Sequence, residues 1–272
     1  MRPWRGVEFG GLRTALVALP LLLAGCASTA IQENQAATSA FALHEVGVEV
    51  QLQSTDDARA AAATNARTLL AEPLTADGAV QIAVGYSPTF QRLLADSAAA
   101  SAAATQSARL PNPILSYSRL AAGDVTEIER ALTLSLLDFV LLPQRRRLAD
   151  LQQAQHRLRS AGDVIGTATA AREAWIDAVA ARQSLAYAAQ AQKAAEAGAE
   201  LGRRMAAVGN FSRLEAAREQ AFYAETTAEV ARAQLEAQRT REVLIRLLGL
   251  SGDLADMLTL PDRLPDLPAN PD

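Results

Sequence analysis

Few residues in this 272-residue chain have the type and spacing that chemistry would need. There are two histidines, His44 and His156, and one cysteine, Cys26, and the histidines stand apart from other metal-binding side chains. Glu173 and Asp177 share one helix face, where we interpret them as solvated charges because no cleft is expected there. No phosphate-binding loop, catalytic triad or metal-ligand spacing is present in the sequence. We therefore expect no enzyme activity, no metal site and no cofactor.

Cys26 ends a segment organised like an export signal. Three arginines precede an apolar run at 15–24 that is too short to cross a bilayer of about 30 Å as a helix. The sequence Leu23-Ala24-Gly25-Cys26 resembles the lipobox of a bacterial lipoprotein signal. This resemblance implies a signal peptide at 1–25 and acyl chains attached through the Cys26 sulfur. An ordinary secretory signal with a chance cysteine is the alternative.

The residue after Cys26 bears on the expected location. Gram-negative lipoproteins with aspartate at that position tend to stay at the inner membrane, and here it is Ala27. The resemblance thus implies a lipid-anchored protein of the Gram-negative outer membrane that extends into the periplasm.

Composition indicates a mainly helical chain. Alanine makes up 60 of the residues, half of the chain is hydrophobic and only 4% is aromatic. No proline falls between Pro143 and Pro261, so long helices are possible there. This composition excludes a collagen, a disulfide-stapled domain and a zinc finger. The net charge of −4 gives no drive toward DNA or RNA, so we expect no nucleic-acid partner.

The first half of the mature chain divides into an arm, a helix and two strands. Residues 26–72 are weakly patterned, which is typical of a tether or a loosely helical arm. A helical run follows to about 109, with Thr75 as N-cap, Asp77 in the first turn and an interruption at 86–88. Apolar and hydroxyl residues then alternate at 115–118 and at 132–136, continuing to 141, around a turn-like 121–124. Alternation alone does not distinguish a membrane strand from a soluble hairpin.

The second half is expected to form a helical hairpin. The first helix covers 144–207, and its apolar seam has the 3,4 spacing of a coiled coil: Leu151, Ala154, Leu158, Ala161, Ile165 and Ala168. Gly209-Asn210 ends it, and Ser212 with Glu215 forms a capping box for a second helix that ends at Gly249. The second seam consists of Leu214, Ala217, Ala221, Ala224, Ala228, Ala231 and Leu235. Alanine seams bury little apolar area, so the hairpin needs neighbours and we expect self-association.

This order of elements at 73–250 resembles one repeat of the TolC-like outer-membrane efflux protein family. The motifs that carry the resemblance are, in chain order, Leu74-Thr75-Ala76-Asp77-Gly78-Ala79-Val80, Ser87-Pro88, Leu110-Pro111-Asn112-Pro113, Leu142-Pro143-Gln144-Arg145-Arg146-Arg147, Val208-Gly209-Asn210-Phe211-Ser212 and Leu247-Leu248-Gly249-Leu250. The implied fold is mainly α: a long coiled-coil hairpin and a two-strand transmembrane β-hairpin that contributes to an oligomeric α/β barrel. Of its strand residues we expect five at the membrane: Leu115, Tyr117, Leu132, Leu134 and Leu136.

The resemblance implies a passive export conduit of a tripartite efflux system. Its partners are outer-membrane lipid, a periplasmic adaptor protein and an inner-membrane pump. The adaptor is expected to dock at the tip of the helical hairpin, on Val208, Gly209, Asn210, Phe211 and Ser212.

The family normally carries two such repeats and forms trimers, whereas this sequence contains one repeat and then a proline-rich tail at 251–272. Three copies supply six strands, fewer than the usual minimum of about eight, and six copies supply twelve. A half-length truncated member, a hexamer and a pairing with a second half-length chain all remain open.

Two other function classes fit parts of the sequence. A structural periplasmic coiled-coil lipoprotein needs no strands, so helix or loop at 113–141 would favour it. A periplasmic adaptor needs β segments on both sides of its hairpin, and the stretch after Leu250 is short for one. Arg145, Arg146 and Arg147 could contact lipid phosphates or form a solvated helix start. Trp175 and Tyr187 are expected to pack.

Overall fold

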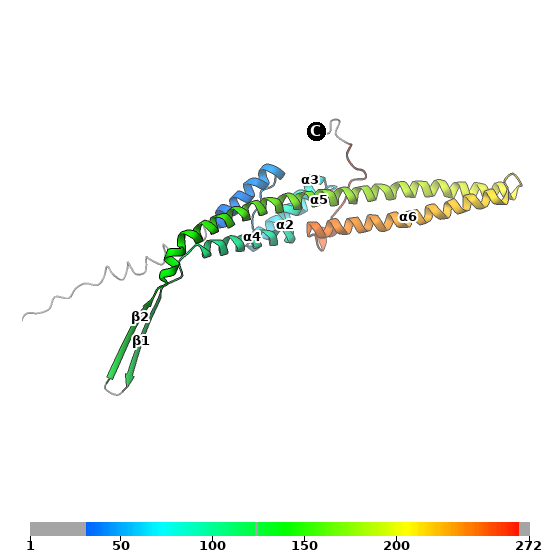
Figure 1. Cartoon of the computed structure of the whole chain (residues 1–272). Helices are drawn as coiled ribbons and strands as arrows, with labels where there is room; N and C mark the ends of the chain where they lie inside the picture. Colours follow the sequence, from blue (N-terminus) through cyan, green and yellow to red (C-terminus); the bar gives the residue numbers. More distant parts are fainter. Residues whose placement is uncertain (1–30, 123–124, 267–272) are drawn as a thin grey trace, which may run out of the picture. The chain divides into compact units, whose positions relative to one another are not determined.

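The computed structural model describes residues 31–122 and 125–266, and the side chains of 121, 122 and 125 are not described. The chain is mainly helical with one small sheet. Its elements are a helix at 31–46, α2 (Asp56–Leu70), α3 (Ala76–Gly85), α4 (Pro88–Ser107), β1 (Ile114–Ala122), β2 (Val125–Thr133), α5 (Leu136–Ala207), α6 (Arg213–Leu248) and α7 (Asp253–Asp256) (Figure 1). The signal at 1–25 and Cys26 lie outside the described residues.

The chain divides into two compact units, which we treat separately. Unit 1 consists of residues 1–41 and 93–162, and unit 2 of residues 42–92 and 163–272. The residues of α4 and of α5 are divided between the two units.

Unit 1 contains the β-hairpin and a buried polar cluster. Asn34 is 7% exposed, and its side-chain amide donates to Ser101 Oγ at 2.8 Å and to Gln153 Oε1 at 2.5 Å. Its carbonyl oxygen accepts from Arg157 Nε at 2.6 Å. Every polar atom of the Asn34 side chain is therefore hydrogen-bonded. The cluster fixes the position of the helix at 31–46 along α4 and α5, because a shift would leave a buried polar atom unpaired.

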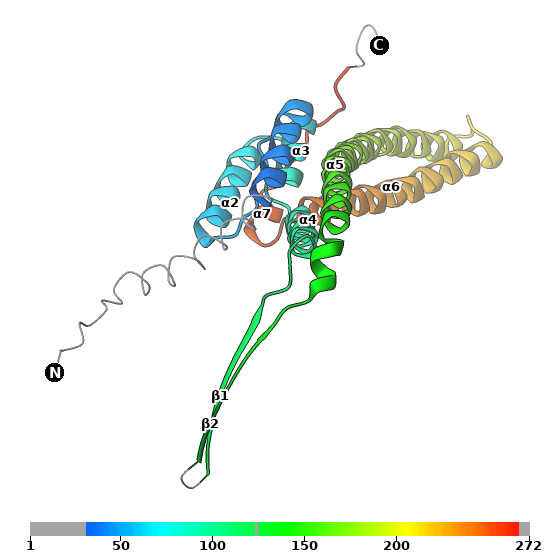
Figure 2. The same cartoon turned by 60° about the vertical axis from the view of Figure 1, so that its left-hand side comes forward.

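Unit 2 contains most of the apolar core. The largest fully buried side chains there come from α3, α4, α5, α6 and the segment before α3: Phe90, Leu74, Ile82, Leu244, Leu248, Val80, Val84, Val164 and Val179. The junction of α3 and α4 packs against the end of α6, because Ser87 Oγ donates to the Leu247 carbonyl at 3.0 Å. Gly249 ends α6 in the left-handed conformation, as the sequence predicts, and a Cβ added there would lie 2.3 Å from Pro88 Cδ. The antiparallel pair α5 and α6 continues away from this core (Figures 1 and 2).

The local helix signals agree with the structure. Thr75 Oγ1 accepts from the Gly78 N–H at 3.0 Å as the N-cap of α3. Ser212 and Glu215 form the capping box of α6, and Gly209 has a φ of +79° in the preceding turn. Each of these features depends on residues within about one turn of one another.

The expected tether or loosely helical arm is helical at 31–46 and at 56–70, where Ala66 and Leu70 are buried. Two expectations about segment ends were wrong. The long helix begins at Leu136 instead of 144 and contains Pro143. The expected strand at 132–141 ends at Thr133, so Leu134 lies in a connection and Leu136 opens α5. In the proline-rich tail, Leu254, Leu258 and Leu260 are buried.

The end of β2 has a simple cause. The ladder begins at the pair Ile114 and Thr133, so the next pair would join Pro113 to Leu134. Proline has no N–H to donate, and pairing therefore stops there.

Candidate functional site

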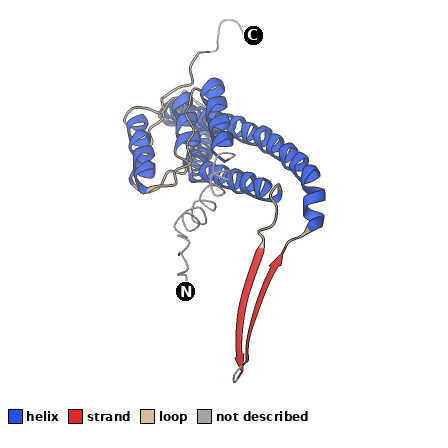
Figure 3. Ribbon diagram, turned by 90° about the vertical axis from the view of Figure 1, so that its left-hand side faces the viewer, coloured by secondary structure: helices blue, strands red, loops and turns tan. Residues whose placement is uncertain are grey.

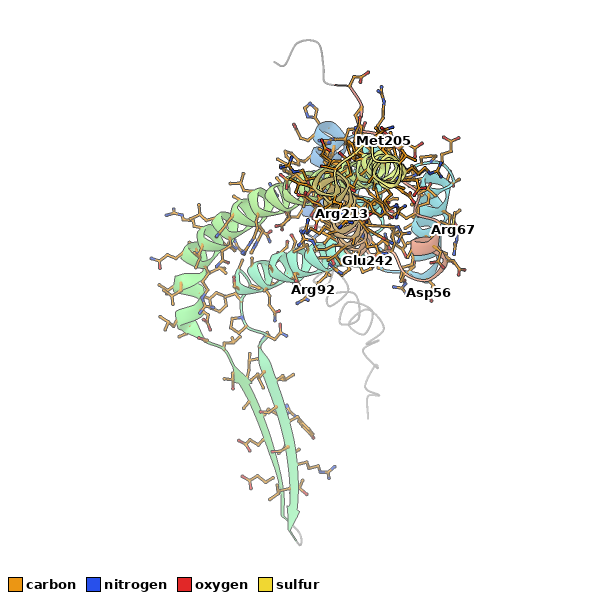
Figure 4. The ribbon with its side chains drawn as sticks, turned by 90° about the vertical axis from the view of Figure 1, so that its right-hand side faces the viewer. Asp56, Arg67, Arg92, Met205, Arg213 and Glu242 are labelled. Carbon is orange, nitrogen blue, oxygen red and sulfur yellow. The ribbon has the colours of Figure 1, made fainter. Side chains whose placement is uncertain are left out.

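The β-hairpin exposes side chains on both faces. Its antiparallel register runs from Ile114 opposite Thr133 to Ala122 opposite Val125. Leu115 and Leu132 are directly paired and are 79% and 63% exposed, and Tyr117 is 62% exposed opposite Arg130. No described element of unit 1 covers the two strands (Figure 3), and their side chains project freely to either side (Figure 4).

The register assigns charge of opposite sign to the two faces. Directly paired residues share a face, so Tyr117, Arg130, Arg119 and Ile128 lie together with Leu115 and Leu132. The other face carries small polar and acidic side chains: Ser116, Ser118, Glu127, Glu129 and Thr133, with Ile114 and Leu120. The hairpin also has two outer edges, because β1 and β2 pair only with each other in the described sheet.

Two of the five expected membrane-strand residues are not on a strand. Leu134 is 49% exposed and Leu136 is 78% exposed, and both belong to the entry into α5. Leu115, Tyr117 and Leu132 do lie on β1 and β2, on one face. The exposed apolar surface therefore extends from the strands onto the first turns of α5.

The tip of the helical hairpin is a tight turn with local hydrogen bonds. The Gly209 N–H donates to the Ala206 carbonyl at 3.2 Å, and the Asn210 N–H donates to the Met205 carbonyl at 2.9 Å. The Ser212 N–H donates to Glu215 Oε2 at 2.8 Å, and the Glu215 N–H donates to Ser212 Oγ at 3.1 Å. Hydrogen bonding by the Ser212 side chain, and then by its backbone N–H, lowers the pKa of the Glu215 carboxyl.

The five expected docking residues lie together at this tip. Val208 is 72% exposed, Gly209, Asn210 and Ser212 are exposed, and Phe211 is half-buried. In Figure 4, Met205 on α5 and Arg213 on α6 mark the approach to the turn from its two helices. On the last turns of α5, the Glu200 carboxylate pairs with Arg203 and Arg204, and hydrogen bonds from these guanidinium groups lower its pKa.

Close approach of α5 and α6 near the tip depends on small residues. A Cβ added at Gly198 would lie 3.1 Å from Glu219 Oε2, and one added at Gly202 would lie 3.4 Å from Glu219 Cγ and 3.5 Å from Phe211 Cε1. The Glu219 side chain thus faces α5 across these glycines, which identifies the inner face of α6.

The inner face of α6 is not the predicted seam. Between Arg213 and Arg239, the residues that are not exposed repeat at the 3,4 spacing: Ala216, Glu219, Tyr223, Thr226, Val230, Ala233 and Ala237. All seven residues of the predicted seam, from Leu214 at 62% to Leu235 at 67%, are exposed. Two residues of α-helix turn the chain by about 200°, so these two stripes lie on roughly opposite faces. We call Leu214, Ala217, Ala221, Ala224, Ala228, Ala231 and Leu235 the outer stripe.

Exposed apolar residues also follow α5. In unit 2 they are Ile165, Ile176, Tyr187 and Leu201, between 41% and 64% exposed. In unit 1, Leu151 and Leu158 of the predicted seam are 69% and 77% exposed. Of the two residues expected to pack, Trp175 is 4% exposed and its indole N–H donates to the Leu74 carbonyl at 2.7 Å, whereas Tyr187 is 64% exposed.

Other candidate chemical residues are dispersed. His44 is exposed, and its Nδ1 lies 2.8 Å from Glu45 Oε1. His156 is half-buried, and Glu173 and Asp177 are exposed. Over residues 31–122 and 125–266, no group of three or more His, Cys, Asp or Glu side chains could hold a metal ion. In the same ranges no helix is both long enough and apolar enough to span a membrane.

Comparison with known proteins shows a likeness of fold. No family model and no curated protein matches the chain. A crystal structure of a membrane protein from Pseudomonas aeruginosa is similar, with a TM-score of 0.51 and 21% sequence identity over 76% of this chain. The match covers 48% of that protein, so the chain spans about half its length.

Sequence reasoning missed two surfaces. One is the second stripe of α6, which repeats with the same period and was therefore available as a signal. The other is the apolar start of α5, whose alternating Leu132-Thr133-Leu134-Ser135-Leu136 continued the strand pattern past the end of the ladder.

Proposed function

We propose that the chain is the outer-membrane channel component of a tripartite efflux system of the TolC-like type, a passive export conduit. The observation that carries this proposal is the pair of opposed stripes on α6. The inner stripe includes Glu219 and Thr226 and packs toward α5, whereas the outer stripe is apolar throughout and repeats with the same period, as expected for a helix with a second neighbour. Within unit 2 the inner face packs toward α5, so the outer stripe is left for another chain.

This arrangement favours a closed ring of helices. In a ring, every helix has two lateral neighbours and the same contact repeats head to tail between copies. The outer stripe is rich in alanine, which permits close approach, and α5 offers larger exposed side chains such as Tyr187 and Leu201 as its counterpart. Hairpins that all point the same way would then line a tunnel.

The β-hairpin supports a membrane end for this tunnel. Each strand has nine residues, which is the lower end of the roughly 9–11 residues that a tilted transmembrane strand needs. Its unpaired outer edges need further strands, because backbone groups in lipid must be satisfied by closure into a barrel. The described part of the chain holds one hairpin, so other copies, a second chain or further sequence would supply the rest. Three copies would bring six strands and six copies twelve.

The same proposal assigns adaptor docking to the tip and anchoring to Cys26. Val208 and its neighbours at the turn present a small, partly apolar surface stiffened by the Ser212–Glu215 capping box. Acylation of Cys26 would hold the chain at the periplasmic face of the outer membrane. The structural coiled-coil lipoprotein and the adaptor are the competing functions. The former requires no strands, and the latter requires β segments on both sides of its helical hairpin, whereas β1 and β2 both precede α5.

The test combines the mass of the assembly in mild detergent with conductance in planar bilayers. We expect a discrete oligomer with stable conductance, lost when the outer stripe is charged by Ala221→Glu and Ala228→Glu. The matched control, Gln220→Glu with Gln234→Glu, adds the same charge to α6 outside the outer stripe and should leave both readouts unchanged. A stable oligomer without conductance would favour the structural lipoprotein. A monomer without conductance would contradict self-assembly of a channel by this chain alone.

A further inference from the structure

The start of α5 presents a run of exposed apolar side chains. From Leu134 to Val140 five large residues are exposed, namely Leu134 at 49%, Leu136 at 78%, Leu137 at 66%, Phe139 at 51% and Val140 at 74%. Exposed apolar residues are ordinary when scattered singly, but a contiguous run of this kind marks a contact with another apolar phase or partner.

Three arginines follow this run in helical register. Arg145 comes seven residues after Asp138, and Arg145 Nη2 lies 2.6 Å from Asp138 Oδ1, whose side chain is only 15% exposed. This ion pair occupies one guanidinium group. Arg146 and Arg147 are exposed, and within the described residues neither makes an ion pair.

The free arginines share their helix faces with apolar residues. Arg146 follows Phe139 by seven residues, and Arg147 follows Val140 by seven, which is about two turns or 10.5 Å along the axis. Helical side chains lean toward the N-terminus, so both guanidinium groups reach back toward the apolar run. The polar interface of a bilayer extends about 5–7 Å beyond the hydrocarbon on each side, so arginine side chains that reach back from about 10.5 Å can place their guanidinium groups in this zone.

We propose that residues 134–147 bind the surface of a bilayer, with the apolar run at the edge of the hydrocarbon and Arg146 and Arg147 on the phosphate groups of anionic phospholipids. Arginine suits this role because its planar fork donates two parallel hydrogen bonds to a phosphate. The charge of Arg146 and Arg147 favours lipid over a second copy of the chain as the binding partner. A second copy that covered this surface would have to place a carboxylate next to each arginine. This inference goes beyond the proposed function, since it requires a membrane but no pore.

Native mass spectrometry of the full chain in mild detergent tests the proposal, with phosphatidylglycerol and phosphatidylcholine as probes. The native sequence should retain phosphatidylglycerol preferentially. In R146Q/R147Q this preference should fall about 25-fold at low salt, from about fivefold per arginine near a charged lipid surface. The control R213Q/R218Q removes the same charge from exposed positions on α6 and should bind lipid like the native chain.

Two further measurements guard against trivial explanations. R146K/R147K keeps the positive charge without the planar guanidinium group and should retain part of the preference for phosphatidylglycerol. Circular dichroism of R146Q/R147Q and R146K/R147K shows whether either variant loses lipid binding because it misfolds. Raising the salt concentration should weaken binding of phosphatidylglycerol to the native chain.

The proposal is overturned if R146Q/R147Q retains phosphatidylglycerol as well as the native chain, or if R213Q/R218Q loses it equally. It is also overturned if R146Q/R147Q changes the oligomeric mass and leaves lipid retention intact, because a neighbouring copy then covers this surface. Absence of conductance would contradict the proposed channel and leave these lipid measurements unaffected.

Discussion

Replacing Gly249 with alanine should destabilise the packing of α6 against the start of α4 in unit 2. Gly249 has a φ of +70°, and an added Cβ would lie 2.3 Å from Pro88 Cδ and 3.3 Å from Pro88 N. A left-handed alanine costs about 1–2 kcal/mol. Forcing a methyl group into a packed site costs about 1–3 kcal/mol more, since neither the proline ring nor its backbone can move easily. The free energy of unfolding of this unit should therefore fall by roughly 2–5 kcal/mol.

Gly209 provides a matched control for the part of the destabilisation that comes from the left-handed backbone conformation. Its φ is +79°, but nothing lies within 4 Å of an added Cβ, so Gly209→Ala should cost only the strain of about 1–2 kcal/mol. The double variant Gly249→Ala with Pro88→Ala removes the clash with the proline ring. It should therefore recover part of the free energy of unfolding that Gly249→Ala alone loses. Urea unfolding of the full chain and amide exchange at the end of α6 measure these differences. Equal destabilisation by Gly249→Ala and Gly209→Ala would refute the reasoning.

Three other changes test single contacts. Trp175→Phe removes the indole donor from the buried Leu74 carbonyl and should lower the free energy of unfolding by about 1–3 kcal/mol. The control Tyr187→Phe, at an exposed site, should change it little, and thermal unfolding measures both. The pKa of Glu215 is lowered in the folded chain, so the capping box is fully effective above the ordinary glutamate pKa of about 4.3 and is lost as pH falls through the lowered value. Exchange of the Ser212 amide, corrected for its intrinsic rate, should rise in that range, and the same pH dependence in Glu215→Gln would contradict this origin. Gly209→Trp should weaken cross-linking of the tip to an adaptor and reduce efflux, with Gln220→Trp as control, and unchanged cross-linking and efflux would exclude docking at the tip.

Features that arise within one turn of chain can be predicted from the sequence. Thr75, Gly209, Ser212 with Glu215, and Gly249 act on backbone groups three or four residues away, so their local chemistry is readable without a fold. A mainly helical hairpin and a two-stranded segment follow from the same kind of signal.

Which surfaces are covered depends on contacts between segments that are distant in the sequence. The sequence of α6 carries two stripes of equal period, and only the position of α5, set by the close approach at Gly198 and Gly202, makes the stripe through Glu219 the inner one. The end of β2 depends on the observed register, in which the next partner of Leu134 would be Pro113. The helix at 31–46 is placed against α4 and α5 by Asn34, whose partners Ser101 and Gln153 are distant in sequence. Periodicity fixes the faces of a helix or strand, whereas burial is a property of its neighbours in space.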